Sequence, residues 1–163
     1  MIYIIYGQPG SGKTVLGKIV ADRLLTPYII DGDEFRKIFK NDNYGRQGRI
    51  ENIKAANACA TYLNLLHGHN VILSLVNPYD YLRKELRILN KNVLEVYLHS
   101  GRDLRKEYHV KDFEVGDPEI SLNTDLPIEA TWEGYKRAVG KLYSVTPREH
   151  LEFKGSEESK RLV

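Results

Sequence analysis

The chain contains very little cysteine, because Cys59 is the only one among its 163 residues. A single thiol cannot form a disulfide within the chain, so the fold has to rest on an apolar core, and the length suits one domain. Scarce cysteine is typical of the reducing cytoplasm, where we expect this protein to act.

An excess of charge of either sign is also absent. The chain has 24 lysines and arginines against 22 aspartates and glutamates, and its formal net charge is +2. Both signs are spread along the chain, so no long-range field attracts it to a nucleic acid or to a membrane surface. We therefore expect a small molecule as its partner.

Long apolar runs are missing as well. One uncharged stretch lies between Lys54 and Asp80, but Asn64, His67 and Gly68 interrupt it. A helix that spans a bilayer needs about 20 predominantly apolar residues. This stretch instead predicts a helix, a turn and a buried strand.

The most informative motif lies near the N-terminus. Residues 7–14 read Gly-Gln-Pro-Gly-Ser-Gly-Lys-Thr, the pattern G-x-x-x-x-G-K-[ST]. An apolar run precedes them and an amphipathic stretch follows, which is the order of strand, loop and helix in a phosphate-binding loop. The alternative is a glycine-rich turn that only caps a helix, and the ordered context argues against it.

Each residue of this loop has an expected task. The residues that would surround the phosphates of a nucleotide with backbone N–H groups are Gly7, Gly10, Ser11 and Gly12. Lys13 would bridge the β- and γ-phosphates, and the Thr14 hydroxyl would hold Mg²⁺. The first turn of the following helix would add the positive end of its dipole.

Strand and helix patterns alternate along the rest of the chain. Strands are expected at residues 1–6, 28–30, 71–76, 93–98 and 119–122. Helices are expected at residues 12–25, 35–39, 50–67, 79–89, 101–108 and 127–143. This order predicts an α/β fold of three layers, with helices on both faces of a parallel five-stranded sheet. We expect one domain over residues 1–143 and a polar C-terminal tail over residues 144–163.

Carboxylates follow the second expected strand, at Asp31 and Asp33. Parallel strands end at one edge of a sheet, so these carboxylates should lie beside the phosphate loop. One of them would ligate Mg²⁺ or accept the proton of an attacking hydroxyl. For Asp33 the alternative is that it caps a helix that begins at Glu34, and the two roles can coexist.

Arginines and an uncharged segment complete this edge. Segment 74–79, Ser-Leu-Val-Asn-Pro-Tyr, offers an aromatic ring that would flank a base, or else it is an ordinary turn. Arg36 and Arg49 would bind an anionic acceptor through forked hydrogen bonds, unless they are solvated surface charges. Arg102 and Arg105 follow the fourth strand, where a lid arginine would neutralise charge in the transition state, with a charged helix surface as the alternative.

Together these residues resemble the adenylylsulfate kinase family of P-loop kinases. Segment 31–36, Asp-Gly-Asp-Glu-Phe-Arg, is similar to the family's D-G-D-N-x-R, and segment 49–53 is similar to R-x-E-N-I. Segment 74–79 is similar to S-x-x-S-P-Y, segment 94–97 to F-x-E-V-Y, and segment 102–108 to R-D-x-K-G-L-Y. The resemblance extends over about residues 1–126.

The resemblance implies a three-layer P-loop kinase fold and transfer of the γ-phosphate of ATP to the 3′-hydroxyl of adenosine 5′-phosphosulfate, with Mg²⁺, in sulfate assimilation. Lys13, Asp33 and Arg105 would be catalytic, with Thr14 and Asp33 at the metal and Arg102 at ATP. The residues expected at the acceptor nucleotide are Asp31, Arg36, Arg49, Asn52, Ser74, Tyr79 and Phe113. Phe113 is included because the family's long F-T-G-I-D segment is reduced here to residues 111–117.

Two other functions stay open on the sequence. The chain would be a kinase for another hydroxyl, on a nucleoside, a modified nucleobase or a small metabolite. Alternatively it would bind a nucleotide without catalysis, although Lys13, Thr14 and Asp33 argue against that reading. A homodimer is one of the assemblies that the sequence leaves open.

Overall fold

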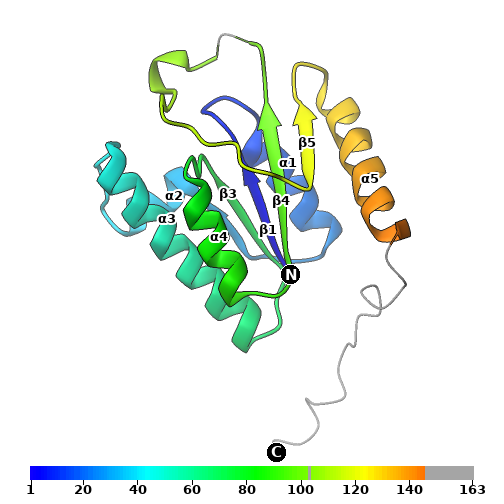
Figure 1. Ribbon diagram of the computed structural model, residues 1–163, viewed down its shortest axis with the longest axis horizontal. Coiled ribbons are helices and arrows are strands. Elements are labelled where there is room, and N and C mark those ends of the chain that lie inside the picture. Colours follow the sequence, from blue (N-terminus) through cyan, green and yellow to red (C-terminus); the bar gives the residue numbers. More distant parts are fainter. Residues whose placement is uncertain (103, 146–163) are drawn as a thin grey trace, which may run out of the picture.

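The computed structural model describes residues 1–102 and 104–145 (Figure 1). The strands are β1 (Ile2–Tyr6), β2 (Ile29–Asp31), β3 (Val71–Leu75), β4 (Val93–His99) and β5 (Ile120–Asn123). The helices are α1 (Lys13–Arg23), α2 (Gly32–Ile38), α3 (Arg46–Thr61), α4 (Asp80–Leu89) and α5 (Ile128–Val145). A π-helical turn, η1 (Tyr62–Leu66), continues α3, and a single 3₁₀ turn, η2 (Lys106–Tyr108), follows β4.

The five strands form one sheet in the order β2-β3-β1-β4-β5, and every neighbouring pair is parallel. β1 lies at the centre, where Ile4 pairs with Leu73 of β3 and with Glu95 of β4. β1 and β3 are almost entirely buried, as expected for strands that are covered on both faces. The predicted α/β fold with a parallel five-stranded sheet is confirmed.

Helices cover both faces of the sheet. The core on one face packs α2, α3 and α4 against side chains such as Ile4 and Leu73, while α1 and α5 pack against Ile5 and Val96 on the other face (Figure 1). Ile4 and Ile5 take opposite sides because successive side chains of a strand alternate. All five strands run in the same direction, so the loops at their carboxyl ends gather at one edge.

The expected helix at residues 101–108 is wrong for the part of it that the structure describes. Arg105 has φ of 55°, a left-handed conformation that an α-helix does not contain, and only η2 is helical. The backbone N–H of Gly101 bonds instead to the Asp125 carboxylate at 3.0 Å, and that of Arg102 bonds to Ser100 Oγ at 3.1 Å. Such bonds to the first N–H groups are compatible with a helix start, so the left-handed Arg105 is the feature that excludes a continuous α-helix.

Several boundaries also differ from the sequence expectation, and α2, for example, begins at Gly32 and not at residue 35. α3 begins at Arg46 and not at residue 50, with Gly45 as its N-cap residue, so Arg49 lies within the first turn. α5 continues to Val145, two residues beyond the expected end, and the remainder of the expected tail lies outside the described residues. In the part of the chain that is described, no helix has the length and apolar content needed to cross a bilayer.

Candidate active site

The phosphate loop connects β1 to α1 through a left-handed backbone. Gly10 and Gly12 both have φ of 85°, a conformation that residues with a side chain rarely adopt. A Cβ atom at Gly12 would meet nothing within 4 Å, so the concavity in front of α1 is open. Gly12 provides no side-chain cap for α1, so the free N–H groups of its first turn are available to an anion.

Lys13 lies over this loop. Its Nζ donates to the carbonyl oxygen of Gln8 at 2.8 Å and to Ser11 Oγ at 3.4 Å. Burial lowers the pKa of Lys13 to about 8, although the nearby carboxylates of Asp33 and Asp31 favour its charged form. A bound polyphosphate would favour the charged form further, so the lysine is suited to neutralise it.

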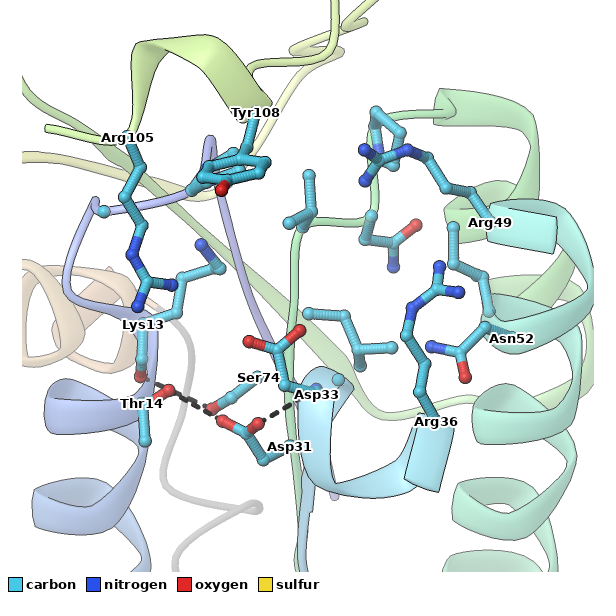
Figure 2. Close-up of a pocket in the computed structure, with 18 of the residues that line it drawn as sticks. Lys13, Thr14, Asp31, Asp33, Arg36, Arg49, Asn52, Ser74, Arg105 and Tyr108 are labelled. Atoms are coloured by element: carbon cyan, nitrogen blue, oxygen red, sulfur yellow. Dashed lines mark hydrogen bonds between the residues drawn. The ribbon is translucent and has the colours of Figure 1, made fainter. Parts of the chain in front are cut away.

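Asp31, and not Asp33, is the N-cap residue of α2. Its Oδ1 accepts from the backbone N–H groups of Asp33 at 3.1 Å and Glu34 at 3.4 Å, and its Oδ2 accepts from Thr14 Oγ1 at 2.6 Å. The alternative in which Asp33 caps this helix is therefore wrong. The carboxylate of Asp33 is left to the cavity that it lines (Figure 2).

The oxygens of Thr14 and Asp31 fit the preference of Mg²⁺ for hard oxygen ligands. They lie within 2.6 Å of each other beside the phosphate loop, and Asp33 lines the same space. These residues would hold the ion together with the phosphates of the nucleotide, and the ion would neutralise charge on the transferring group.

One cavity of about 780 Å³ joins the phosphate loop to α3. Figure 2 shows Lys13, Thr14 and Arg105 on one side of this cavity and Arg49 with Asn52 on the opposite side. Asp33 lies between the two groups. Most of the predicted site residues therefore line a single space, although they come from five separate segments of the chain.

The arginines on the α3 side differ in how they are held. Arg36 is 7% exposed, and its Nη1 donates to the carbonyl oxygens of Asn41 at 3.2 Å and Asn43 at 3.0 Å. Arg49 is half-buried and lines the cavity beside it. Asn52 is buried, and its Oδ1 has no hydrogen-bond partner among the described residues. The guanidinium of Arg36, which these bonds orient, forms with Arg49 and Asn52 a site for an anion and the polar atoms next to it.

Two aromatic residues predicted at the acceptor lie outside the cavity lining. Tyr79 is 1% exposed and lies under the Arg46 guanidinium, which is 4.5 Å from its ring centre. Phe113 stacks on the Tyr6 ring at 6.3 Å. The segment that carries Phe113 is drawn into the protein because Arg83 Nη2 donates to the carbonyl oxygens of residues 114 and 115.

Two tyrosines that we did not assign from the sequence line the cavity instead, Tyr44 and Tyr108. Both are more than half exposed, and Tyr44 also stacks against the Arg36 guanidinium at 4.6 Å. Tyr108 is the tyrosine at the end of the segment similar to R-D-x-K-G-L-Y, so the motif could have indicated it as a site residue. Tyr44 lies in the polar loop before Arg49, where no pattern separates it from an ordinary surface residue.

The remaining predicted residues lie around the phosphate loop. Arg102 lines a second cavity of about 320 Å³ together with Ser11 and Gly10, and its Nη2 donates to the Thr124 carbonyl oxygen at 2.6 Å. Gly7 directly follows β1, and its backbone N–H bonds to the carbonyl oxygen of Val76. A further contact is made by Ser74, whose Oγ donates to the carbonyl oxygen of Lys13 at 3.4 Å. The structure thus separates Arg102 from the cavity that holds Arg105.

The fold, the phosphate loop and the carboxylates at the ends of neighbouring strands define a protein of the P-loop kinase class. Residues 1–114 match the family model of adenylylsulphate kinase, and the chain belongs to this family. The family that the sequence motifs resembled is thereby confirmed.

Individual relatives differ in the substrate that they are named for. The chain is 38% identical over 106 residues to a cytidine diphosphoramidate kinase of Campylobacter jejuni. The matched region covers 59% of this chain and 59% of that protein. It is 32% identical over 110 residues to an adenylyl-sulfate kinase of a Synechococcus strain, which covers 64% of this chain and 62% of that protein. The chain thus matches less than two thirds of the length of these relatives.

Among solved structures, the Mycobacterium tuberculosis APS kinase CysC, in complex with AMPPNP and APS, superimposes with a TM-score of 0.70. The match covers 85% of this chain and 96% of that one at 19% sequence identity, so it bears on the fold alone.

Proposed function

We propose that this protein is an Mg²⁺- and ATP-dependent kinase that phosphorylates the 3′-hydroxyl of adenosine 5′-phosphosulfate. The observation that carries the proposal is the single cavity in which Lys13 and Thr14 face Arg49 across Asp33. A phosphate donor at one end and an anionic nucleotide at the other would bring the acceptor hydroxyl to the carboxylate between them.

The residues of the loop would bind and orient the donor. The backbone of residues 10–13 and the Lys13 ammonium would hold the β- and γ-phosphates, with Mg²⁺ at Thr14 and Asp31. Arg105 lines the same cavity and would place a further positive charge over the transferring group. Water would be excluded by the lid segment that Arg105 belongs to.

Asp33 would act on the acceptor. Its carboxylate accepts the proton of the hydroxyl as the oxygen of that hydroxyl bonds to the γ-phosphorus, and the bond from this phosphorus to the β-phosphate oxygen breaks. ADP leaves with the electron pair of that bond. Because Asp31 rather than Asp33 caps α2, the Asp33 carboxylate is available for this role.

The far end of the cavity would select the acceptor. Arg36 is already oriented by its bonds to residues 41 and 43, and a guanidinium fork matches two oxygens of a phosphate or sulfate group. Tyr44 and Tyr108 offer flat faces on which a nucleobase would stack. Adenosine 5′-phosphosulfate presents both a base and an anion.

A second candidate acceptor is cytidine diphosphoramidate, the substrate named for the Campylobacter relative at 38% identity. Like adenosine 5′-phosphosulfate, it carries two linked acid groups on a nucleoside, so Arg36 and Arg49 would suit it as well. Its terminal phosphoramidate differs from a sulfate because it carries N–H groups. Hydrogen-bond acceptors in the cavity lining would therefore distinguish the two.

A phosphotransfer assay tests the proposal. The purified protein would be incubated with Mg²⁺, ATP labelled at the γ-phosphate and each acceptor, and the labelled product would be separated by chromatography. We expect label on the nucleotide acceptor with wild type and none with the Lys13→Ala variant. Transfer to a nucleoside or to a non-nucleotide metabolite alone would instead support the alternative of a kinase for another hydroxyl.

A further inference from the structure

Asn77 lies in the wall of the large cavity with an unused carboxamide. It is 1% exposed, and neither Oδ1 nor Nδ2 has a hydrogen-bond partner among the described residues. A buried amide without partners costs folding free energy, which a protein retains most readily where a ligand uses the group. The family pattern S-x-x-S-P-Y has serine at this position, so the carboxamide is a departure of this chain.

The backbone of Asn77 is fixed by a buried arginine. Arg83 is fully buried, its Nη1 donates to the Asn77 carbonyl oxygen at 2.7 Å, and its Nε donates to Glu95 Oε2 at 3.0 Å. The Tyr6 ring packs against the guanidinium at 4.2 Å. Asn77 has φ of 42°, a left-handed conformation that asparagine tolerates better than most residues. The position of its side chain is therefore set by the core and not by a loose turn.

The lining of the cavity that contains Asn77 offers two kinds of hydrogen-bonding group. Arg36 and Arg49 can only donate, and phosphate or sulfate oxygens satisfy them. Asn77 offers an NH₂ group that donates and a carbonyl oxygen that accepts, whichever way its amide is turned. Asn52, which lines the same cavity, holds a second unpartnered carbonyl oxygen. An acceptor nucleotide with oxygens alone at its terminal group leaves these carbonyl oxygens unpaired.

We infer that Asn77 is a specificity-determining residue that favours an acceptor whose terminal group carries an N–H, the chemistry of a phosphoramidate, over one that ends in sulfate or phosphate. This inference rests on the proposed kinase activity and on placing the terminal group of the acceptor at the Arg36 and Arg49 end of the cavity, and it favours the second candidate acceptor over adenosine 5′-phosphosulfate. The amidate N–H donates to Oδ1 of Asn77 while a neighbouring phosphoryl oxygen accepts from Nδ2. A serine hydroxyl at the same position also donates and accepts, but its single oxygen lies closer to the backbone and does not replace the separate donor and acceptor ends of the carboxamide.

The test compares two acceptors that differ in one non-hydrogen atom, the terminal nitrogen of cytidine diphosphoramidate against the terminal oxygen of cytidine diphosphate. Both would be assayed with labelled ATP on wild type, on Asn77→Ser and on Asn57→Ser. Asn57 is the matched control, since it is a buried asparagine with an unpartnered Oδ1 that lies outside the cavity lining and donates to the Leu82 carbonyl oxygen. We expect wild type to favour the amidate, and Asn77→Ser to lose about tenfold in kcat/KM on the amidate alone.

Several outcomes would overturn the inference. They are an equal kcat/KM of wild type for the two cytidine nucleotides, an equal loss on both in Asn77→Ser, or the same change of preference in Asn57→Ser. Where Asn77→Ser does not fold, Asn77→Gly keeps the left-handed backbone and takes its place, and calorimetric binding of the two nucleotides to wild type shows whether an amidate preference exists at all. A protein that phosphorylates adenosine 5′-phosphosulfate but shows no amidate preference loses only this inference, whereas failure on all three nucleotides removes the proposed function as well.

Discussion

The roles of Asp31 and Asp33 can be separated by a pair of alanine substitutions. Asp31 accepts two backbone N–H groups at the start of α2 and the Thr14 hydroxyl, whereas Asp33 stands in the first turn of the helix and lines the cavity. Asp31→Ala should therefore destabilise the fold, and Asp33→Ala should mainly abolish phosphotransfer.

The magnitudes follow from these contacts. Removing an N-cap carboxylate costs about 0.5–2 kcal/mol, and the lost hydroxyl bond adds about 0.5–1.5 kcal/mol. For a domain of this size about 1 kcal/mol shifts Tm by ~2–4 °C, so Asp31→Ala should melt roughly 2–14 °C below wild type. Asp33 gives only the attraction of the helix dipole, about 0.3–1 kcal/mol, which the better helix propensity of alanine largely offsets.

Activity should fall in both variants, since Asp31 would also hold Mg²⁺, but only Asp33→Ala should lose activity without a large loss of stability. Loss of a general base typically lowers the rate by about 10²–10⁴. The assay is thermal unfolding together with kcat/KM per folded molecule for both variants, with Asp42→Ala as an exposed control in the loop before α3. An Asp33→Ala protein that melts well below Asp31→Ala, or that keeps its turnover per folded molecule, would refute the reasoning.

Three further predictions concern the two ends of the cavity. Lys13→Ala should keep the fold and lose about 10²-fold or more in kcat, measured by phosphotransfer beside a melting curve, and near-normal turnover of the folded variant would contradict the assignment of the loop. Burial lowers the pKa of Lys13 to about 8. Above that pH the folded state therefore binds fewer protons than the unfolded state. The free energy of unfolding of wild type should then rise from pH 8 toward pH 10 relative to that of Lys13→Ala. A pH series of urea denaturation checks this sign, and a wild-type curve parallel to that of the variant would oppose it. Arg49→Ala should weaken the acceptor by about 1.5–3 kcal/mol in calorimetric titrations and leave an ATP analogue unchanged, with partial recovery in Arg49→Lys; equal weakening of both ligands would place Arg49 elsewhere in the mechanism.

Local sequence was enough for the parts of the site that depend on neighbouring residues. The loop between β1 and α1 follows from the order of an apolar strand, glycines and an amphipathic helix, and the carboxylates at residues 31 and 33 follow directly from the end of β2. Hydrophobic patterning likewise predicted the parallel sheet, because strands that are buried on both faces have to be apolar throughout. Such features are decided within a few residues along the chain.

Tertiary structure decided what depends on distant partners. Asp125 at the end of β5 holds the backbone N–H of Gly101, and the left-handed conformation of Arg105 excludes the continuous helix that the charges of residues 101–108 suggested. Arg83 draws residues 114 and 115 inward, and Phe113 then stacks on Tyr6 instead of facing the acceptor. Hydrogen bonds of this kind join residues that are more than 20 positions apart, and only the folded chain determines which donors and acceptors meet.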